Sequence, residues 1–258
     1  MTGDRGWLGS YLIRYLRKNN VPALGWSQYS SSTSVSRIVH CGAKHPTSSS
    51  HEIQSSNVAW VEEIADLALQ HSADLIFCSS TSVYGPMTGL VDERSDCRPV
   101  DSYSTAKLWA ERYLMKSGAR CLSARLPAIL QDSDTKGWIS KLLVRLINHQ
   151  PIDIPSGLST YNSLLSRRQF AEFVYSLGPM EEYDMVNLAC TPSHSLWEII
   201  TYAKSRLRSR SELTETPGGE ARYYSINKAH QGYGYKMTSP LEAINMWSDC
   251  LRSESVAG

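Results

Sequence analysis

Tyr103 and Lys107 stand four positions apart, a spacing that places two side chains one turn apart on the same face of a helix. A lysine ammonium beside a phenol favours the phenolate, so we expect Lys107 to lower the pKa of Tyr103. A tyrosine tuned in this way transfers protons as a general acid or base near neutral pH. A serine at the end of the strand that precedes the pair is expected to hydrogen-bond the reacting oxygen. These three residues predict hydride transfer to or from a carbonyl, provided that a nicotinamide lies nearby.

The expected elements around this pair separate it from a chance match. Tyr224 and Lys228 have the same spacing, but no serine precedes them at the end of a strand, so we interpret them as accidental. Residues 74–80 have the composition of a short buried strand. A helix is expected to start at residue 101 or 102, where both side chains are good caps, and to stop at Gly118. The alternative is that the first tyrosine is an ordinary surface residue with a helical lysine neighbour.

Three glycines near the start of the chain predict a site for an anion. Gly3, Gly6 and Gly9 are evenly spaced, and the residues after them show the apolar period of a helix. Glycines in such a loop permit a tight turn and let backbone N–H groups approach a pyrophosphate at the N-terminus of the helix. The alternative is a plain glycine-rich turn.

Five segments together resemble the extended short-chain dehydrogenase/reductase superfamily, in particular the NAD-dependent epimerase/dehydratase group. Most members of this group act on nucleotide sugars. The segments follow the order of the family with roughly its spacing, and they cover the first half of the chain well. The segments are residues 2–9, 38–43, 79–85, 103–107 and 124–127.

The resemblance implies an α/β fold with a Rossmann-like, doubly wound parallel sheet. Residues 1–130, with a return strand near residues 184–190, are expected to form the NAD(P)-binding domain, and residues 131–258 a smaller, interwoven substrate-binding lobe. The family places a strand before its first glycine, but only Met1 and Thr2 precede Gly3 here. The first strand is therefore expected to be missing or truncated, and the true start to lie upstream of Met1.

Residue roles follow from the same resemblance. Ser80, Tyr103 and Lys107 are expected to be catalytic, with Ser79 as the alternative to Ser80. The substrate is expected to contact Ser80, Thr81 and Arg168, the alternative being that Arg168 belongs to an exposed basic pair with Arg167. The expected cofactor contacts are Gly3, Arg5, Gly6, Trp7, Leu8, Gly9, Ser27, Ala43, Tyr103, Lys107 and Pro127.

Substitutions in the family motifs narrow the expected reaction. Sugar dehydratases carry an Asp-Glu pair where this chain has Thr81 and Ser82, and one class of epimerase-reductase carries a cysteine at Ser82. The remaining chemistry is 4-keto reduction or 4-epimerisation of a nucleotide sugar by an NAD(P)-dependent oxidoreductase. The alternative is a catalytically inactive NAD(P)-binding or scaffold protein of the same fold.

Residues at the ribose end of the expected site favour NADP, with NAD also possible. Residues 25–28 contain no carboxylate that would hold the ribose hydroxyls of NAD and repel a 2′-phosphate. Arg5 lies where some NADP-dependent relatives carry an arginine that binds this phosphate. The alternative is that Arg5 is merely solvated.

Composition sets the remaining expectations. The formal net charge of +1 gives no electrostatic reason to expect nucleic acid or membrane as a partner. The sequence has no long apolar run and no signal peptide, so we expect a cytoplasmic protein with reduced cysteines. No metal site is expected, because His40, His45 and His51 have a loop setting. By resemblance, the helices that begin at Asn57 and Asp101 are expected to pair across a homodimer.

The other expected elements complete the pattern. Strands are expected at residues 21–25, 37–43, 119–129 and 185–189, and further helices at residues 57–70, 137–149, 196–207 and 240–251.

Overall fold

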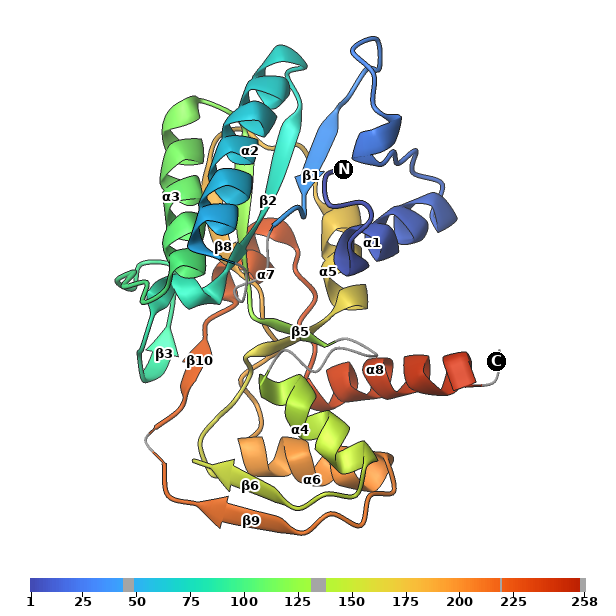
Figure 1. Ribbon diagram of the computed structural model, residues 1–258, viewed down its shortest axis with the longest axis vertical. Helices are drawn as coiled ribbons and strands as arrows, with labels where there is room; N and C mark the ends of the chain where they lie inside the picture. Colours follow the sequence, from blue (N-terminus) through green and yellow to red (C-terminus); the bar gives the residue numbers. More distant parts are fainter. Residues whose placement is uncertain (44–48, 131–137, 219, 256–258) are drawn as a thin grey trace. The chain divides into compact units, whose positions relative to one another are not determined.

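The computed structural model describes residues 1–43, 49–130, 138–218 and 220–255 (Figure 1). His45 and the expected helix start at Gly137 lie outside these ranges. The chain forms two compact units, each assembled from three segments. Unit 1 comprises Met1–Pro86, Arg94–Leu126 and Ala171–Asn187, and unit 2 comprises Met87–Glu93, Pro127–Phe170 and Leu188–Gly258. Within the described ranges, every helix is too short or too polar to cross a membrane.

Unit 1 is built on a parallel sheet of four strands in the order β1-β2-β4-β8. The strands are β1 (Arg37–His40), β2 (Asp74–Ser80), β4 (Cys121–Leu126) and β8 (Asp184–Asn187). Both central strands are buried along nearly their whole length, as expected for strands covered on two faces. The predicted α/β fold with a parallel sheet is therefore confirmed.

Helices cover both faces of this sheet. They are α1 (Trp7–Lys18), α2 (Ser50–Gln70), α3 (Ser102–Ser117) and the greater part of α5 (Arg167–Ser176), with short 3-10 helices η1 (Trp26–Gln28) and η2 (Thr81–Tyr84). Helices α2 and α3 pack side by side, and Figure 1 shows α1 and α5 on the opposite side of the strands. The Tyr15 and Tyr175 rings of α1 and α5 meet edge to face at 6.3 Å. The helices therefore bury the sheet that carries the candidate site.

Two predictions for unit 1 were wrong: one expected strand does not form, and one expected helix starts earlier than predicted. Residues 21–25 form no strand. Pro22 has no N–H to donate, and the carbonyls of Ala23 and Leu24 accept from the Arg17 side chain and the Met1 amino group instead. The helix expected from Asn57 starts at Ser50, because the Ser49 hydroxyl caps the backbone of Glu52 and its own N–H is held in return by the Glu52 carboxylate.

Unit 2 contains three small parallel strand pairs and a separate apolar core. The pairs are β3 (Gly89–Val91) with β10 (Arg222–Tyr224), β5 (Ala128–Leu130) with β7 (Leu164–Ser166), and β6 (Ile152–Pro155) with β9 (Leu213–Thr216). The helices are α4 (Trp138–Ile147), α6 (Leu196–Arg206), α7 (Asn227–Tyr233) and α8 (Pro240–Ser255). Ile139, Ile199 and Ile244 of α4, α6 and α8 are fully buried together in the core. The expected helices in this half of the chain are thus present, and Tyr224 lies in a strand, so its spacing from Lys228 carries no helical meaning.

Candidate active site

Helix α3 fixes Tyr103 and Lys107 near its first turn. Asp101 caps the helix by accepting a hydrogen bond from the Ser104 N–H at 2.7 Å. Gly118 ends it with a left-handed backbone, φ 77°. The predicted start, stop and register are confirmed, and both side chains belong to a regular helix with well-defined ends.

Ser80 faces Tyr103 from the end of β2. The Ser80 hydroxyl accepts hydrogen bonds from the Ser82 N–H at 3.2 Å and the Ser82 hydroxyl at 2.9 Å, and it lies close enough to Tyr103 to lower the pKa of the phenol. Burial raises the pKa of Tyr103 to about 12, although the neighbouring Ser80 hydroxyl acts in the opposite direction. The phenol is therefore neutral near pH 7, which is the form that donates a proton.

Lys107 is buried, and it does not lower the pKa of Tyr103 as we expected from the sequence. Its Nζ donates to the carbonyl of Cys78 at 2.7 Å and lies 5.8 Å from the centre of the Tyr103 ring. The ammonium is thus directed to the β2 backbone. Burial lowers the pKa of Lys107 to about 8, while Cys78, Cys41 and Glu111 oppose the change. Lys107 therefore connects α3 to β2 beside the tyrosine.

Ser79 has a structural partner of its own. Its hydroxyl donates to the Glu111 carboxylate at 2.6 Å, and Glu111 forms a buried ion pair with Arg125 at 2.7 Å. Arg125 also donates to the Tyr84 hydroxyl, which donates to Asn187 at 2.7 Å. Because neighbouring residues of a strand point to opposite faces, Ser79 enters this network while Ser80 faces Tyr103. This arrangement supports Ser80 over Ser79 as the site serine, and the sequence analysis did not foresee the network.

The glycine loop is packed too closely for larger residues. Gly3 has φ +66°, and a Cβ on it would lie 2.7 Å from the Gly42 nitrogen. A Cβ on Gly9 would collide with the Gly3 carbonyl. Helix α1 follows, with no acidic residue in its first turn and no side-chain cap on its N-terminus. Backbone N–H donors at such a helix start suit an anionic group, so the loop fits a dinucleotide pyrophosphate.

Asp4 is a site residue that the sequence analysis missed. Its carboxylate accepts a long hydrogen bond from the Ser27 hydroxyl at 3.5 Å and occupies the space where a Cβ on Gly25 would stand. The segment expected to lack a carboxylate therefore has one beside it, supplied by the glycine loop. Arg5 is exposed. Its positive charge and the negative charge of Asp4 are adjacent in the same loop.

The other predicted residues lie in different settings. Trp7 and Leu8 form the first turn of α1, and Ala43 is exposed beyond the end of β1. Thr81 is only 4% exposed. Pro127 and Arg168 belong to unit 2, so their roles stay predictions.

The chain belongs to the NAD dependent epimerase/dehydratase family, whose model matches residues 1–171. The predicted family is thereby confirmed. The comparison with curated proteins found no match.

Solved structures show the same fold at low identity. UDP-glucuronic acid 4-epimerase from Bacillus cereus, solved with NAD, is 16% identical with a TM-score of 0.80, covering 98% of this chain and 97% of that chain. UDP-N-acetylglucosamine 4-epimerase from the same organism is 15% identical with a TM-score of 0.77, covering 97% and 98%. RMD from Pseudomonas aeruginosa, solved with NADPH, is 15% identical with a TM-score of 0.76, covering 97% of both chains.

Proposed function

We propose that this protein is an NAD(P)-dependent oxidoreductase that carries out 4-keto reduction or 4-epimerisation of a nucleotide sugar. The observation that carries the proposal is that the Tyr103 phenol and Lys107 share the first turns of α3, with the Ser80 hydroxyl beside the phenol at the end of β2. Family membership and structural similarity to enzymes named for nucleotide sugars support this substrate class.

Each residue of the site has a distinct role in the proposed reaction. Ser80 orients the sugar oxygen, and Tyr103 donates a proton to that oxygen as the carbonyl becomes a hydroxyl. In the oxidising direction of an epimerisation, Tyr103 takes the proton back. Lys107, held by the Cys78 carbonyl, fixes α3 against β2 and so positions Tyr103 for both steps. A bound nicotinamide supplies or accepts the hydride.

The glycine loop is proposed to hold the cofactor. Gly3, Gly6 and Gly9 bring the start of α1 to the pyrophosphate, with Trp7 and Leu8 in the same turn. Ser27 and Asp4 would contact the adenosine ribose, and Arg5 would contact a 2′-phosphate. Because the Asp4 carboxylate repels that phosphate while Arg5 attracts it, the two residues oppose each other in selecting NADP over NAD.

Three further residues complete the proposed contacts. Thr81 and Arg168 are proposed substrate contacts, and Pro127 a cofactor contact. Because Thr81 is buried, its contribution would come through the η2 backbone that carries it. An exposed guanidinium such as that of Arg168 suits a diphosphate.

A panel of UDP- and GDP-linked sugars, incubated with the full chain and each of the four nicotinamide cofactors, tests this function. We expect at least one sugar to be reduced or epimerised at its fourth carbon, as followed by proton NMR. If cofactors bind by calorimetry but every sugar is recovered unchanged, the inactive scaffold is the correct alternative.

A further inference from the structure

Two cysteine thiols of unit 1 lie next to each other on neighbouring strands. Strand β1 pairs in parallel with β2 so that His40 is opposite Phe77, and the next residues along the two strands are Cys41 and Cys78. Their Sγ atoms are 3.5 Å apart. Neighbouring strands are separated by about 4.8 Å, which lies within the range of about 4.4–6.8 Å that a disulfide spans between Cα atoms. A bond between these two sulfurs therefore needs only a small movement.

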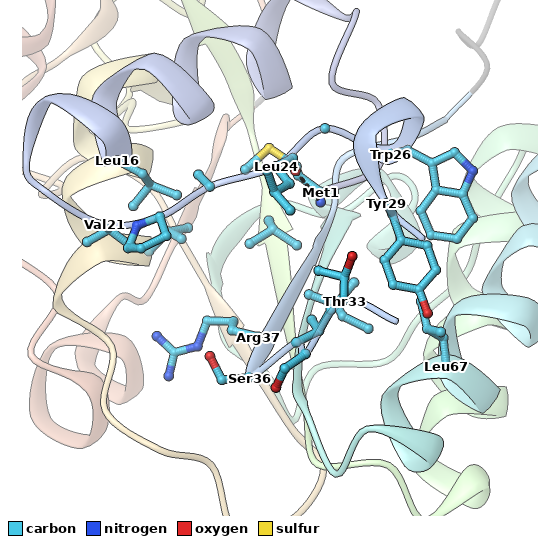
Figure 2. Close-up of a pocket in the computed structure, with 18 of the residues that line it drawn as sticks. Met1, Leu16, Val21, Leu24, Trp26, Tyr29, Thr33, Ser36, Arg37 and Leu67 are labelled. Carbon is cyan, nitrogen blue, oxygen red and sulfur yellow. Dashed lines mark hydrogen bonds between the residues drawn. The ribbon is translucent and has the colours of Figure 1, made fainter. Parts of the chain in front are cut away.

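The environment of this pair is its own. The cavity of about 340 Å³ between β1 and residues 21–25 has no cysteine among its described lining residues (Figure 2). The pair is thus independent of whatever fills that cavity. The other free cysteines in the described part of the chain each have a partner that is not a thiol; they are Cys97, Cys121 and Cys190.

Access and charge set the order in which the two thiols react. Cys41 is partly exposed and Cys78 is only 6% exposed, so a small solute reaches Cys41 first. The hydrogen bond with Cys78 and burial raise the pKa of Cys41, while the charge of Lys107 acts in the opposite direction. Because the thiolate is the nucleophile, Cys41 reacts slowly near neutral pH.

The backbone at Cys41 also supports the glycine loop. A Cβ on Gly3 would lie 2.7 Å from the Gly42 nitrogen and 2.8 Å from the carbonyl carbon of Cys41, so the turn at Gly3 packs directly on this backbone. A disulfide would draw the sulfur of Cys41 from 3.5 Å to about 2.05 Å from that of Cys78. Contacts as close as these transmit such a shift to the loop.

We propose that Cys41 and Cys78 are a redox modification site, at which a small peroxide forms a disulfide that weakens cofactor binding at the glycine loop. The effect on the cofactor rests on the proposed function, whereas the disulfide itself does not.

The reaction has two steps. The Cys41 thiolate attacks one oxygen of the peroxide, the O–O bond breaks, and Cys41 becomes a sulfenic acid while the departing oxygen leaves as water or an alcohol. The Cys78 sulfur then attacks the Cys41 sulfur, the S–O bond breaks, and the departing hydroxide takes the Cys78 proton to form water. The two thiols are oxidised by two electrons in total, and the peroxide is reduced by the same two.

Peptide mapping of the full chain without a reducing agent tests the disulfide. The reduced chain is treated with hydrogen peroxide, and we expect a pair of peptides joined through Cys41 and Cys78, lighter by two hydrogens than the separate peptides and parted by dithiothreitol. Cys97 is also partly exposed, so Cys97→Ser is the matched control and should give the same joined pair. Recovery of both thiols unchanged, or a sulfinic acid on Cys41 without a joined pair, would overturn the proposal.

Cofactor affinity tests the coupling to the glycine loop. After the peroxide is removed, fluorescence titration with NADPH and NADH compares the oxidised and reduced chains. We expect the oxidised chain to bind about tenfold more weakly and dithiothreitol to restore its affinity. Peroxide should leave the affinity of Cys41→Ser unchanged, which separates the disulfide from oxidation of methionines. Equal affinities of the oxidised and reduced wild type would refute the coupling. If the reduced chain binds neither cofactor, the proposed function fails, and the joined peptides alone decide the redox site.

Discussion

Tyr103 and Lys107 are set apart by burial and by their hydrogen-bond partners. Burial raises the pKa of the Tyr103 phenol, the neighbouring Ser80 hydroxyl opposes that rise, and the Lys107 ammonium is fixed on a backbone carbonyl. A surface tyrosine with a helical lysine neighbour would have none of these features. The environment of the two side chains therefore argues for a role in proton transfer more strongly than their spacing does.

The buried ammonium of Lys107 has a measurable effect on stability. Its pKa falls from 10.5 to about 8 on folding, so between these values the unfolded chain binds more protons than the folded chain. Above the unfolded pKa, Lys107 is neutral in both states, so its burial carries no charge penalty. As the pH falls through the folded pKa, a charge must be held in the buried site and the folded chain loses stability. We expect the unfolding free energy of wild type, minus that of Lys107→Met, to increase by about 3 kcal/mol between pH 7 and pH 11. Urea unfolding of both proteins across this range measures it, and a constant difference would contradict the burial of the charge.

Asp4 and Arg5 allow a paired test of cofactor choice. Removing the Asp4 carboxylate should strengthen NADP(H) relative to NAD(H), and removing the Arg5 guanidinium should weaken it, because the 2′-phosphate is negative. We expect the ratio of NADP(H) affinity to NAD(H) affinity to rise about tenfold in Asp4→Asn and to fall about tenfold in Arg5→Ala. Fluorescence titration with both reduced cofactors measures the ratio. A shift in the same direction in both variants, or a uniform loss for both cofactors, would show that these side chains do not read the 2′-phosphate.

Strand β2 is the element that joins the chemistry to the core. Successive side chains of β2 point to opposite faces, so Ser80 faces Tyr103 and Ser79 contacts the buried Glu111–Arg125 pair. The Cys78 carbonyl of the same strand accepts a hydrogen bond from Lys107. Burial lowers the pKa of Arg125, but the hydrogen bonds and charge of Glu111 outweigh this effect and raise it. The ion pair thus ties α3 to the neighbouring strand β4 and keeps the site helix in position.

Breaking this ion pair should cost far more than breaking an exposed one. Glu111→Gln leaves the Arg125 charge buried without a counter-charge, so we expect a loss of about 3 kcal/mol in unfolding free energy. The matched control is Asp96→Asn. Asp96 and its partner Arg98 are each 73% exposed, so the change there should stay below about 1 kcal/mol. Similar losses in the two variants, measured by urea unfolding, would contradict the structural role of the network.

Local sequence signals predicted the elements well and the contacts between them poorly. Asp101 and Gly118 mark the ends of α3 because caps act on neighbouring backbone, and such signals are visible in sequence. The strand expected at residues 21–25 fails because a strand also needs a partner along its length. Asp4 meets Ser27, and Glu111 meets Arg125, only through the folded chain, so spacing could not reveal either contact.

At the scale of the whole molecule, the homodimer that the resemblance implies stays a prediction. Trp109 and Met115 of α3 and Leu69 of α2 are between 37% and 51% exposed. Exposed apolar side chains favour association when a partner covers them. We expect light scattering to give twice the chain mass for wild type and the single chain mass for Trp109→Glu. Trp138→Glu is the matched control, because Trp138 is 44% exposed on α4 of the other unit and should leave the dimer intact. A monomeric wild type would contradict the proposed dimer.

The central claim is that Tyr103 transfers the proton in hydride chemistry. The most direct measurement compares wild type with Tyr103→Phe and with Tyr113→Phe, which alters a second tyrosine of the same helix. Rapid mixing of each enzyme–cofactor complex with its nucleotide sugar follows the absorbance of the reduced nicotinamide. We predict that Tyr103→Phe loses at least about a hundredfold in the rate of this change while its cofactor affinity is retained, and that Tyr113→Phe matches wild type. An unchanged rate in Tyr103→Phe would contradict the account.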